Sequence, residues 1–330
     1  MRIAVTGSGG RLGRALLAAL ANVPLARPAG PFGWDLPEYD LDTSGSAAGL
    51  IERDRPEIIV HTAAWTDVEG CARDPERALR RNGIAVGELA EECAAVGISL
   101  VLISTNEVFD GRRTDRRGYC RDDEPRPINP YGSSKLAGEV AAQAAFGRGV
   151  AAPGPVAAPG PVAAPASGWA RSAGTGPELA IVRTAWLYGP PGNDFPAKIL
   201  AAAERASLAG EPLRVVGDET GSPTYAADLA GAIVALLAAG PFAGLHHVVN
   251  AGTASRAAWA REVLRLAGLG VALEEIPSSA WPRASTPPAW AVLEPTPLPS
   301  GRPLRPWPRA LAAYVPSLRG GGREHGVAGR

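Results

Sequence analysis

Lysine is nearly missing from this sequence: of 33 basic side chains only two are lysines, Lys135 and Lys198, and the others are arginines. Acidic and basic residues cancel to a net charge of zero, which argues against nucleic acid or an acidic membrane surface as a partner. The three cysteines fit no metal-ligand spacing and form no disulfide framework, which indicates a reducing compartment. No apolar run approaches the roughly 20 residues that span a bilayer, and no signal-peptide pattern opens the chain. We therefore expect a cytoplasmic protein.

Short apolar runs alternate with helical patterns along most of the 330 residues. Strands that read as continuous apolar runs between helices indicate a parallel sheet covered on both faces. The fold class is therefore α/β, with a doubly wound parallel sheet. A further strand is expected within residues 24–35, where proline and glycine obscure it. The predicted strands are residues 2–6, 57–62, 99–104, 180–184, 214–216 and 247–250, and the predicted helices are residues 12–21, 75–95, 131–145 and 225–239.

Residues 147–178 differ in composition from their surroundings. The hexapeptide VAAPGP repeats from residue 150 and begins again at residue 162. A tract of Pro, Ala and Gly with few large apolar side chains cannot bury enough surface to offset its ordering entropy. We expect a disordered surface insertion here, and no basic PxxP pattern supports a proline-rich docking site.

A glycine-rich loop lies directly between the first strand and the first helix. Gly7, Gly10 and Gly13 have the spacing GxxGxxG. The first glycine permits a tight turn, the second lets backbone amides approach a pyrophosphate, and the third allows close helix–strand packing. The helix N-terminus adds free donors for the anion. The pattern predicts a dinucleotide site, and a purely structural glycine turn is the alternative.

The residues that would bind the adenosine end are harder to assign. Asp35 is a candidate for the ribose, but it follows the loop by more than the usual spacing of about 20 residues. Asp40 and Asp42 would line the adenine pocket or be solvated loop carboxylates, and Leu41 between them is a candidate cofactor contact. Arg11 would hold a ribose 2′-phosphate or be an exposed first-turn side chain, and Leu12 follows it into the helix. NADPH or NADH is expected, with a lean towards NADPH.

One of the two lysines follows a tyrosine by four residues in the segment Tyr131-Gly-Ser-Ser-Lys135. On a helix, residues i and i+4 share a face, so Lys135 can lie beside Tyr131. An ammonium group is a compact charge whose pKa shifts readily, whereas arginine stays protonated. Lys135 would favour the phenolate and make Tyr131 a proton donor near neutral pH. The alternative is an ordinary surface pair.

Further motifs accompany this pair in order along the chain: IIVHTAAWT at 58–66, STNEVFDG at 104–111, NPYGSSKLAGE at 129–139, RTAWLYG at 183–189, GSPTYAADLA at 221–230 and LRPWPRAL at 304–311. With the glycine loop, they resemble the extended short-chain dehydrogenase/reductase superfamily. Within it, they resemble the dTDP-4-dehydrorhamnose reductase family. The resemblance covers nearly the whole chain apart from the Pro/Ala-rich insertion.

The resemblance implies hydride transfer from a nicotinamide to C4 of a nucleotide-linked 4-keto-6-deoxyhexose, converting dTDP-4-dehydro-L-rhamnose to dTDP-L-rhamnose. Tyr131 would donate a proton to the nascent alkoxide and Thr105 would hydrogen-bond the same oxygen. Lys135 would hold the ribose hydroxyls and lower the pKa of Tyr131. The remaining implied contacts are Ala64, Trp65 and Thr66 with the cofactor, and Asn106 and Trp186 with the sugar.

The sequence departs from the reductase pattern after Ser104-Thr105. Reductases of this family have Asp-Tyr there, and this chain has Asn106-Glu107. The related nucleotide-sugar 4,6-dehydratases resemble Asp-Glu, but Asn106 cannot donate a proton as a carboxylic acid does. Reductase is therefore favoured over dehydratase or epimerase. Glu107 is either a substrate contact or a solvated or ion-paired residue.

Two further questions, a non-catalytic role and the state of assembly, stay open at this point. The reductase branch also resembles the regulatory subunit of methionine adenosyltransferase, a non-catalytic binding partner, although Tyr131 and Lys135 are retained here. A homodimer is a candidate assembly.

The histidines do not indicate a metal site. His61 is expected to be a core histidine, and neither His246 nor His247 has a second ligand residue at a spacing typical of metal sites, so no metal is expected.

The motifs also suggest a division of the chain. Residues 1–188 would form the Rossmann-type NAD(P)-binding domain, including the insertion, and residues 225–252 would return to it. Residues 189–224 and 253–330 would form a smaller α/β substrate-binding region, with loops and short helices after residue 275.

Overall fold

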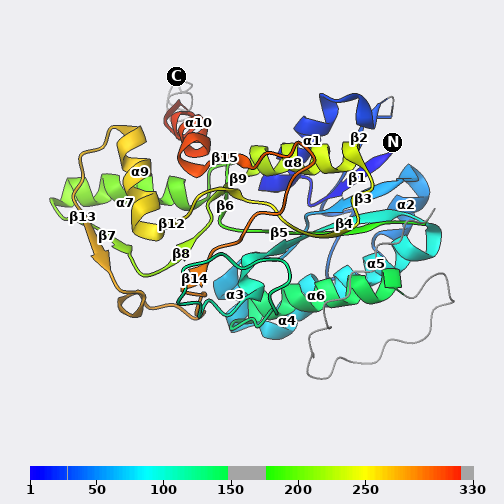
Figure 1. Ribbon diagram of the computed structural model, residues 1–330, viewed down its shortest axis with the longest axis horizontal. Helices are drawn as coiled ribbons and strands as arrows, with labels where there is room; N and C mark the ends of the chain where they lie inside the picture. The colour runs from blue at the N-terminus through cyan, green and yellow to red at the C-terminus, as the bar shows by residue number, and fades with distance from the viewer. Residues whose placement is uncertain (28, 148–175, 321–330) are drawn as a thin grey trace, which may run out of the picture.

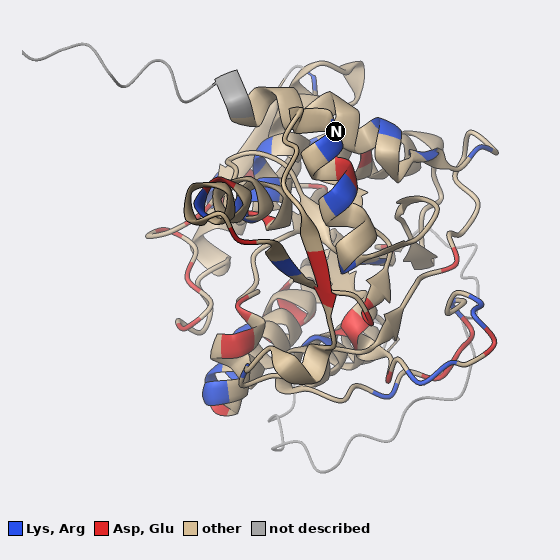
Figure 2. Ribbon diagram, turned by 90° about the vertical axis from the view of Figure 1, so that its left-hand side faces the viewer, with Lys and Arg blue, Asp and Glu red and all other residues tan. Residues whose placement is uncertain are grey.

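The computed structural model describes residues 1–27, 29–147 and 176–320 (Figure 1). The expected disordered insertion at 147–178 therefore lies almost entirely outside the described residues. Over the described ranges, no helix is long and apolar enough to cross a membrane. Acidic and basic segments are interspersed over the face that Figure 2 turns to the viewer.

A six-stranded sheet forms the centre of the larger part of the molecule, and its strands are all parallel. The chain places β2 on one side of β1 and β3 on the other, so the strand order changes direction at β1. In open α/β sheets, ligands bind at such a point beyond the carboxyl ends of the strands. In spatial order the strands are β2 (Pro31–Trp34), β1 (Ile3–Thr6), β3 (Ile58–His61), β4 (Ser99–Thr105), β5 (Leu179–Thr184) and β10 (Gly244–His247).

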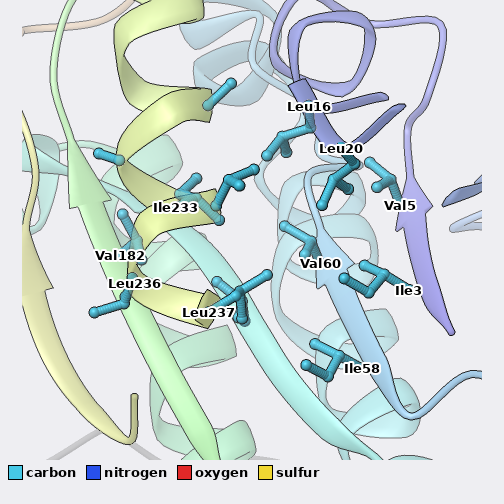
Figure 3. Packing of buried hydrophobic residues seen from close by; sticks show 14 of the residues in the cluster. Ile3, Val5, Leu16, Leu20, Ile58, Val60, Val182, Ile233, Leu236 and Leu237 are labelled. Atoms are coloured by element: carbon cyan, nitrogen blue, oxygen red, sulfur yellow. The ribbon is translucent and has the colours of Figure 1, made fainter. Parts of the chain in front are cut away.

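Helices cover both faces of this sheet, as the sequence predicts (Figure 1). On one face, α1 (Arg11–Ala21) and α8 (Ala226–Ala239) bury aliphatic side chains of alternate strand residues, including those in Figure 3. On the other face, α5 (Ala85–Val96) and α6 (Pro130–Gly147) pack on the intervening strand residues, whose side chains point the opposite way. Because successive strand residues point to opposite faces, both helical layers have an apolar surface to cover. The sheet is thus a doubly wound α/β structure.

The carboxy-terminal part is built from helices and very short strands. An aromatic cluster that contains Tyr188, Trp259 and Tyr314 fills its core. Its helices are α7 (Phe195–Ala209), α9 (Arg256–Ala267) and α10 (Trp307–Gly320). Its strand pairs are β6 (Leu187–Tyr188) with β9 (Thr224–Tyr225), β7 (Leu213–Val216) with β13 (Leu273–Ile276), and β11 (Asn250–Ala251) with β15 (Leu304–Pro306), and β8 (Thr220–Gly221) lies between β12 (Ala254–Ser255) and β14 (Trp290–Ala291).

Several predicted elements differ from the structure. The predicted strand 247–250 is wrong: β10 ends at His247, and β11 pairs elsewhere. The predicted helix 75–95 is divided into α4 (Pro75–Leu79), the π-helical turn η2 (Arg80–Ile84) and α5. Only short helices were expected after residue 275, but α10 in this region has 14 residues. The short 3-10 turn η4 (Ser278–Ala280) lies where short helices were expected. Helical elements without a prediction are α2 (Ala48–Asp54), α3 (Val68–Arg73), α7, α9, and the short 3-10 turns η1 (Pro24–Ala26) and η3 (Asn106–Val108).

Candidate active site

The glycine loop follows β1 at the carboxyl edge of the sheet. Gly7 has φ +63°, a backbone conformation that favours glycine, and a Cβ there would lie 2.8 Å from Ala63 Cα. A Cβ on Gly13 would lie 2.2 Å from Gly7 O, so α1 can approach the loop this closely only with glycine at that position. Gly10 precedes α1 and donates its amide to Gly7 O at 2.9 Å. The loop therefore presents bare backbone at a helix N-terminus.

The segment after β3 is hydrogen-bonded to the end of β1. Thr6 Oγ1 accepts from the amides of Thr62 and Ala63, both at 3.2 Å, and lies 2.9 Å from His61 Nδ1. Thr62 Oγ1 donates to Thr6 O at 2.6 Å. His61 is buried, and this burial lowers its pKa to about 3. The positive charge of Lys135 makes a smaller contribution in the same direction. His61 is thus a neutral core residue that fixes the strand ends.

Trp65, one of the candidate cofactor contacts in the run from Ala64 to Thr66, is held by the π-helical turn. Asn82 accepts from Trp65 N at 2.8 Å, donates to Trp65 O at 2.9 Å, and also donates to Ser134 Oγ at 3.1 Å. Asn82 is fully buried, although it was not identified from the sequence. A π-helical turn inside a helix is often found at a functional site. Here it carries the side chain that joins this loop to α6.

Asp35 lies directly after β2 and contacts the glycine loop. Its Oδ2 accepts from Gly9 N at 2.5 Å, and its Oδ1 accepts from Leu36 N at 2.9 Å. The long sequence spacing is therefore compatible with a position beside the loop. Arg14, on the first turns of α1, donates to Gly9 O at 2.6 Å, so a basic side chain also lies at this edge.

The other candidates at the adenosine end make contacts within the protein. Arg11 Nε donates to Gly189 O at 3.0 Å and its Nη2 donates to Asn193 Oδ1 at 2.5 Å, so it reaches the carboxy-terminal part. Asp40 Oδ1 accepts from Asp42 N at 3.0 Å within a turn. The side chains of Leu12 and Leu41 pack against the two hydrophobic clusters of the sheet.

Thr105, at the end of β4, and Tyr131, in the first turn of α6, meet at the same edge and hydrogen-bond through their side chains. Thr105 Oγ1 also donates to Asn106 Oδ1 at 3.3 Å and accepts from Glu107 N at 3.2 Å. Burial, and next the negative charge of Glu107, raise the pKa of Tyr131. The net pKa is therefore raised, and the lowering expected from Lys135 stays a prediction. Tyr131 is a protonated donor throughout the neutral range.

Lys135 is buried on α6, one turn after Tyr131 and one turn before Glu139, which forms an ion pair with Arg183. Burial lowers the pKa of Lys135 to about 8, while the carboxylate of Glu139 works against the shift. Glu139 accepts from Arg183 Nε at 2.9 Å and Nη2 at 2.6 Å, and from Ser104 Oγ at 2.5 Å. The side chains of Glu139 and Arg183 are 2 % and 4 % exposed. The buried carboxylate of Glu139 thus interacts with both Arg183 and Lys135, and it stabilises the charged form of Lys135.

The carboxy-terminal part supplies an aromatic wall. Trp186 has φ +43°, an unusual conformation for a bulky residue, and strain of this kind clusters at functional sites. Its ring stacks on Trp259 at 5.6 Å between centroids, and the Arg256 guanidinium lies 3.7 Å from its ring centroid. A Cβ on Gly221 would lie 2.5 Å from the Trp186 ring. The ring is therefore fixed between α9 and β8.

A segment after η4 crosses from the carboxy-terminal part to the sheet part. Glu69 accepts from Ala284 N at 2.6 Å and from Ser285 N at 3.3 Å. Asn129 Nδ2 donates to Thr286 O at 3.2 Å. Arg283 is paired with the buried Glu219, which also lies 3.6 Å from Arg256. These bonds hold the two parts together beside Tyr131.

The departure from the reductase pattern at Asn106-Glu107 has a structural counterpart. Asn106 is buried, and its Nδ2 donates to Ala291 O in β14 at 3.0 Å. Glu107 is partly buried, and its Oε2 accepts from Asn129 Nδ2 at 2.7 Å. Burial raises the pKa of Glu107, while Arg256 and Arg283 oppose the shift. The Glu107 carboxyl group is therefore held by Asn129, just before α6, in the turn that follows Thr105.

The geometry at the strand ends fits a dinucleotide. Glycine backbone at the start of α1 fits a pyrophosphate, because any Cβ at Gly7 or Gly13 would fill the space that the loop needs. Lys135 offers a buried ammonium group on the first turns of α6, next after Tyr131 on the same helix face. Within residues 1–27, 29–147 and 176–320, no group of acidic, His or Cys side chains could hold a metal ion.

Comparison with known proteins assigns the family. The family model described as the RmlD substrate binding domain matches residues 1–151 and 169–319, which is most of the chain. This chain belongs to the RmlD family.

Relatives of the RmlD family match this chain along almost all of its length. The dTDP-4-dehydrorhamnose reductase of Mycolicibacterium smegmatis is 33% identical, over 97% of this chain and 86% of the relative. The dTDP-4-keto-6-deoxy-D-glucose reductase of Streptomyces niveus is 34% identical, over 95% of this chain and 96% of the relative. The solved dTDP-4-dehydrorhamnose reductase of Bacillus anthracis, in complex with NADP, has a TM-score of 0.79 and 27% identity, over 96% and 99% of the two chains.

The sequence did not identify several residues of this RmlD-family site. Asn82, Glu139 and Arg183 act through contacts across more than one element, so no short spacing indicates them. Arg256 could not be recognised from the sequence either, because an arginine at the start of an amphipathic helix usually faces solvent. Glu139 and Arg183 lie within the motifs 129–139 and 183–189, and this was the one feature that could have indicated them.

Proposed function

We propose that this chain is an NAD(P)H-dependent reductase of a nucleotide-linked 4-keto-6-deoxyhexose, with dTDP-4-dehydro-L-rhamnose as substrate and dTDP-L-rhamnose as product. The observation that carries the proposal is the position of Thr105 at the end of β4 and of Tyr131 and Lys135 on the first turns of α6, at the sheet edge where the glycine loop follows β1. Family membership and the names of the relatives agree with it.

Thr105 at the end of β4 and Tyr131 in the first turn of α6 act on the carbonyl oxygen. The nicotinamide supplies the hydride to C4 when bound. As the C4 oxygen gains negative charge, the Tyr131 hydroxyl donates its proton to it and the Thr105 hydroxyl hydrogen-bonds it. These donors bind the developing alkoxide more strongly than the ketone, so they lower the barrier. Because burial keeps Tyr131 protonated, the donor is present without a prior ionisation step.

Lys135 acts as a buried cation in the proposed site. Its ammonium group would hold the ribose hydroxyls next to the nicotinamide and favour the Tyr131 phenolate that remains after proton transfer. The buried carboxylate of Glu139 stabilises this positive charge in a low-dielectric environment. The two groups on successive turns of α6 thus serve one step of the reaction.

The contacts of the cofactor are proposed from the strand ends. The amides of the loop from Gly7 to Gly13 would bind the pyrophosphate, with Ala64, Trp65 and Thr66 beside the nicotinamide half. Asp35 suits a free ribose 2′-hydroxyl, whereas the nearby Arg14 suits a 2′-phosphate. Both side chains contact Gly9, so we propose use of NADPH and NADH alike.

The sugar would lie between the sheet edge and the aromatic wall. Trp186 and Asn106 are its proposed contacts, and the regions 189–224 and 253–330 would form the substrate side. The first 188 residues, with residues 225–252, would form the cofactor side, in agreement with the pairing of β10 with β5. A cytoplasmic location and a homodimer are also proposed, and sedimentation of the purified protein tests the dimer.

A single assay tests the proposed function. Wild-type protein is mixed with dTDP-4-dehydro-L-rhamnose and NADPH or NADH, and loss of reduced nicotinamide is followed by absorbance. Tyr131→Phe should lower kcat by about 10²–10⁴-fold, because the proton donor is removed. NADP binding and thermal unfolding of the variant should match wild type. Absence of turnover by the wild type on any related 4-keto sugar would refute the proposal.

A further inference from the structure

We propose that the same site catalyses exchange of the hydrogen on the carbon next to the C4 carbonyl with solvent, and that Glu107 is the base. This inference rests on the proposed function, because it needs a 4-keto sugar bound beside Tyr131. It adds an activity that requires no reduced cofactor.

The position of Glu107 supports the proposal. Glu107 lies in η3, the turn that directly follows Thr105. Its Oε2 accepts from Asn129 Nδ2 at 2.7 Å, two residues before Tyr131. The carboxyl group is therefore held where the end of β4 meets the start of α6, next to the two proposed hydroxyl donors. The electrostatic effect of Glu107 on the pKa of Tyr131 agrees with this position.

The contacts of the carboxylate leave it suited to proton transfer. Asn129 donates to Oε2 at 2.7 Å and fixes the group, while η3 holds its backbone through the bond from Glu107 N to Thr105 Oγ1. Burial and Glu219 raise the pKa of Glu107, whereas Asn129, Arg256 and Arg283 oppose the rise. A carboxylate whose basicity is increased, yet which can still ionise, is the kind of base that removes a carbon-bound proton.

The reaction balances without an oxidant or a reductant. The C–H bond at C3 or C5 breaks and its proton passes to the Glu107 carboxylate. The bonding electron pair forms a carbon–carbon double bond to C4, and the carbonyl electrons move to O4 as an enolate. Tyr131 and Thr105 hydrogen-bond O4, as they would bind the alkoxide during reduction, because both species carry the charge on the same oxygen. Return of a solvent-derived proton from Glu107 restores the ketone.

The experiment measures deuterium uptake by the sugar. Wild-type protein, NADP⁺ and dTDP-4-dehydro-L-rhamnose are mixed in deuterium oxide, so that reduction cannot occur, and the sugar is followed by mass spectrometry and NMR. Wild type should exchange the C3 or C5 hydrogen faster than a protein-free solution. Glu107→Gln should slow this exchange by at least about 100-fold, because the base is lost. Glu124→Gln, the same change at an exposed residue of the 110–127 loop, should exchange at the wild-type rate.

Two outcomes would overturn the inference. One is a wild-type protein that oxidises NADPH with this sugar but exchanges deuterium no faster than the protein-free solution. The other is a folded Glu107→Gln variant that exchanges as fast as wild type. If Glu107→Gln does not fold, Glu107→Asp replaces it, and an unchanged exchange rate then rejects Glu107 as the base. A wild type that fails to oxidise NADPH refutes the proposed function instead, so the two failures are distinguishable.

Discussion

The sheet part and the carboxy-terminal part bury their apolar surface in different ways. In the sheet, strands of four or more residues place aliphatic side chains alternately on two faces, where helices cover them. In the carboxy-terminal part, most strands have two residues, and rings such as Tyr188, Trp259 and Tyr314 pack on one another. Tyr188 and Trp259 have ring centroids 5.5 Å apart.

This difference shows how each part fixes its share of the site. Long parallel strands fix register through regular main-chain hydrogen bonds, so the glycine loop and Thr105 are placed by the sheet itself. Two-residue strands supply few such bonds, and the position of Trp186 depends on side-chain packing. Substitutions in the two parts should therefore damage different functions: cofactor binding on one side and sugar binding on the other.

The largest effect is expected from removal of an aromatic anchor. Trp259 is 1% exposed, and its ring centroid is 4.5 Å from that of Phe195. Trp259→Ala should lower the free energy of unfolding by about 3–5 kcal/mol, because a large cavity remains. It should also raise KM for the sugar, since Trp186 loses its stacking partner, while NADP affinity stays within twofold.

Urea unfolding and cofactor titration measure these two effects. Leu208→Ala is the matched control, because Leu208 is 90% exposed and its loss should change stability by less than about 0.5 kcal/mol. A Trp259→Ala variant that weakens NADP binding as strongly as sugar binding would show that the two parts are not separate in function.

The next effect concerns the buried pair on the sheet side. Glu139→Gln should lower the free energy of unfolding by about 3 kcal/mol, because Arg183 and Lys135 lose their buried counter-charge. The amide can still hydrogen-bond Ser104, which limits the loss. Denaturant unfolding measures it, and the double variant Glu139→Gln/Arg183→Met should recover part of the stability. A fully stable single variant contradicts the role of this pair.

A smaller effect is expected from pH. Lys135 has its pKa lowered to about 8, and the ammonium form is the active one in the proposed site. Activity should therefore be retained below pH 8, and kcat/KM should fall by about tenfold per unit above it, equivalent to about 1.4 kcal/mol per unit. In Glu139→Gln this decline should begin at lower pH, because Glu139 supports the charge. A profile that is flat to well above pH 8 excludes this assignment.

The smallest effect is expected from an exposed pair in the carboxy-terminal part. Arg261 and Glu275 are 2.5 Å apart, and their side chains are 52% and 47% exposed. Arg261→Ala should change the free energy of unfolding by less than about 1 kcal/mol, because solvent screens the pair. Thermal unfolding at low and high salt measures this. A loss comparable with that of Glu139→Gln would contradict the distinction between buried and exposed pairs.

The sheet could be predicted well because its strands are continuous apolar runs with helices between them. Each strand of residues 2–6, 57–62, 99–104 and 180–184 has its counterpart in the structure within one residue at each end. The two-residue strands could not be predicted, since they have no periodicity to detect. The π-helical turn at Arg80–Ile84 was likewise hidden inside an ordinary helical pattern.

The candidate site divides in the same way. Tyr131 and Lys135 could be singled out because one helix places them one turn apart. The raised pKa of Tyr131 could not, because it depends on burial and on Glu107 in a separate element. Arg11 contacts Gly189 and Asn193, which lie far along the chain, so no local pattern could indicate these contacts.

The left-handed backbone of Trp186 sets two opposite demands on one position. A glycine would relax the main chain, whose strain is of the order of 1–3 kcal/mol, but it would remove the ring that stacks on Trp259 and supports Arg256. Loss of a packed aromatic side chain lowers stability by a comparable or larger amount. Laboratory evolution under heat should therefore retain an aromatic residue at this position even without an activity screen.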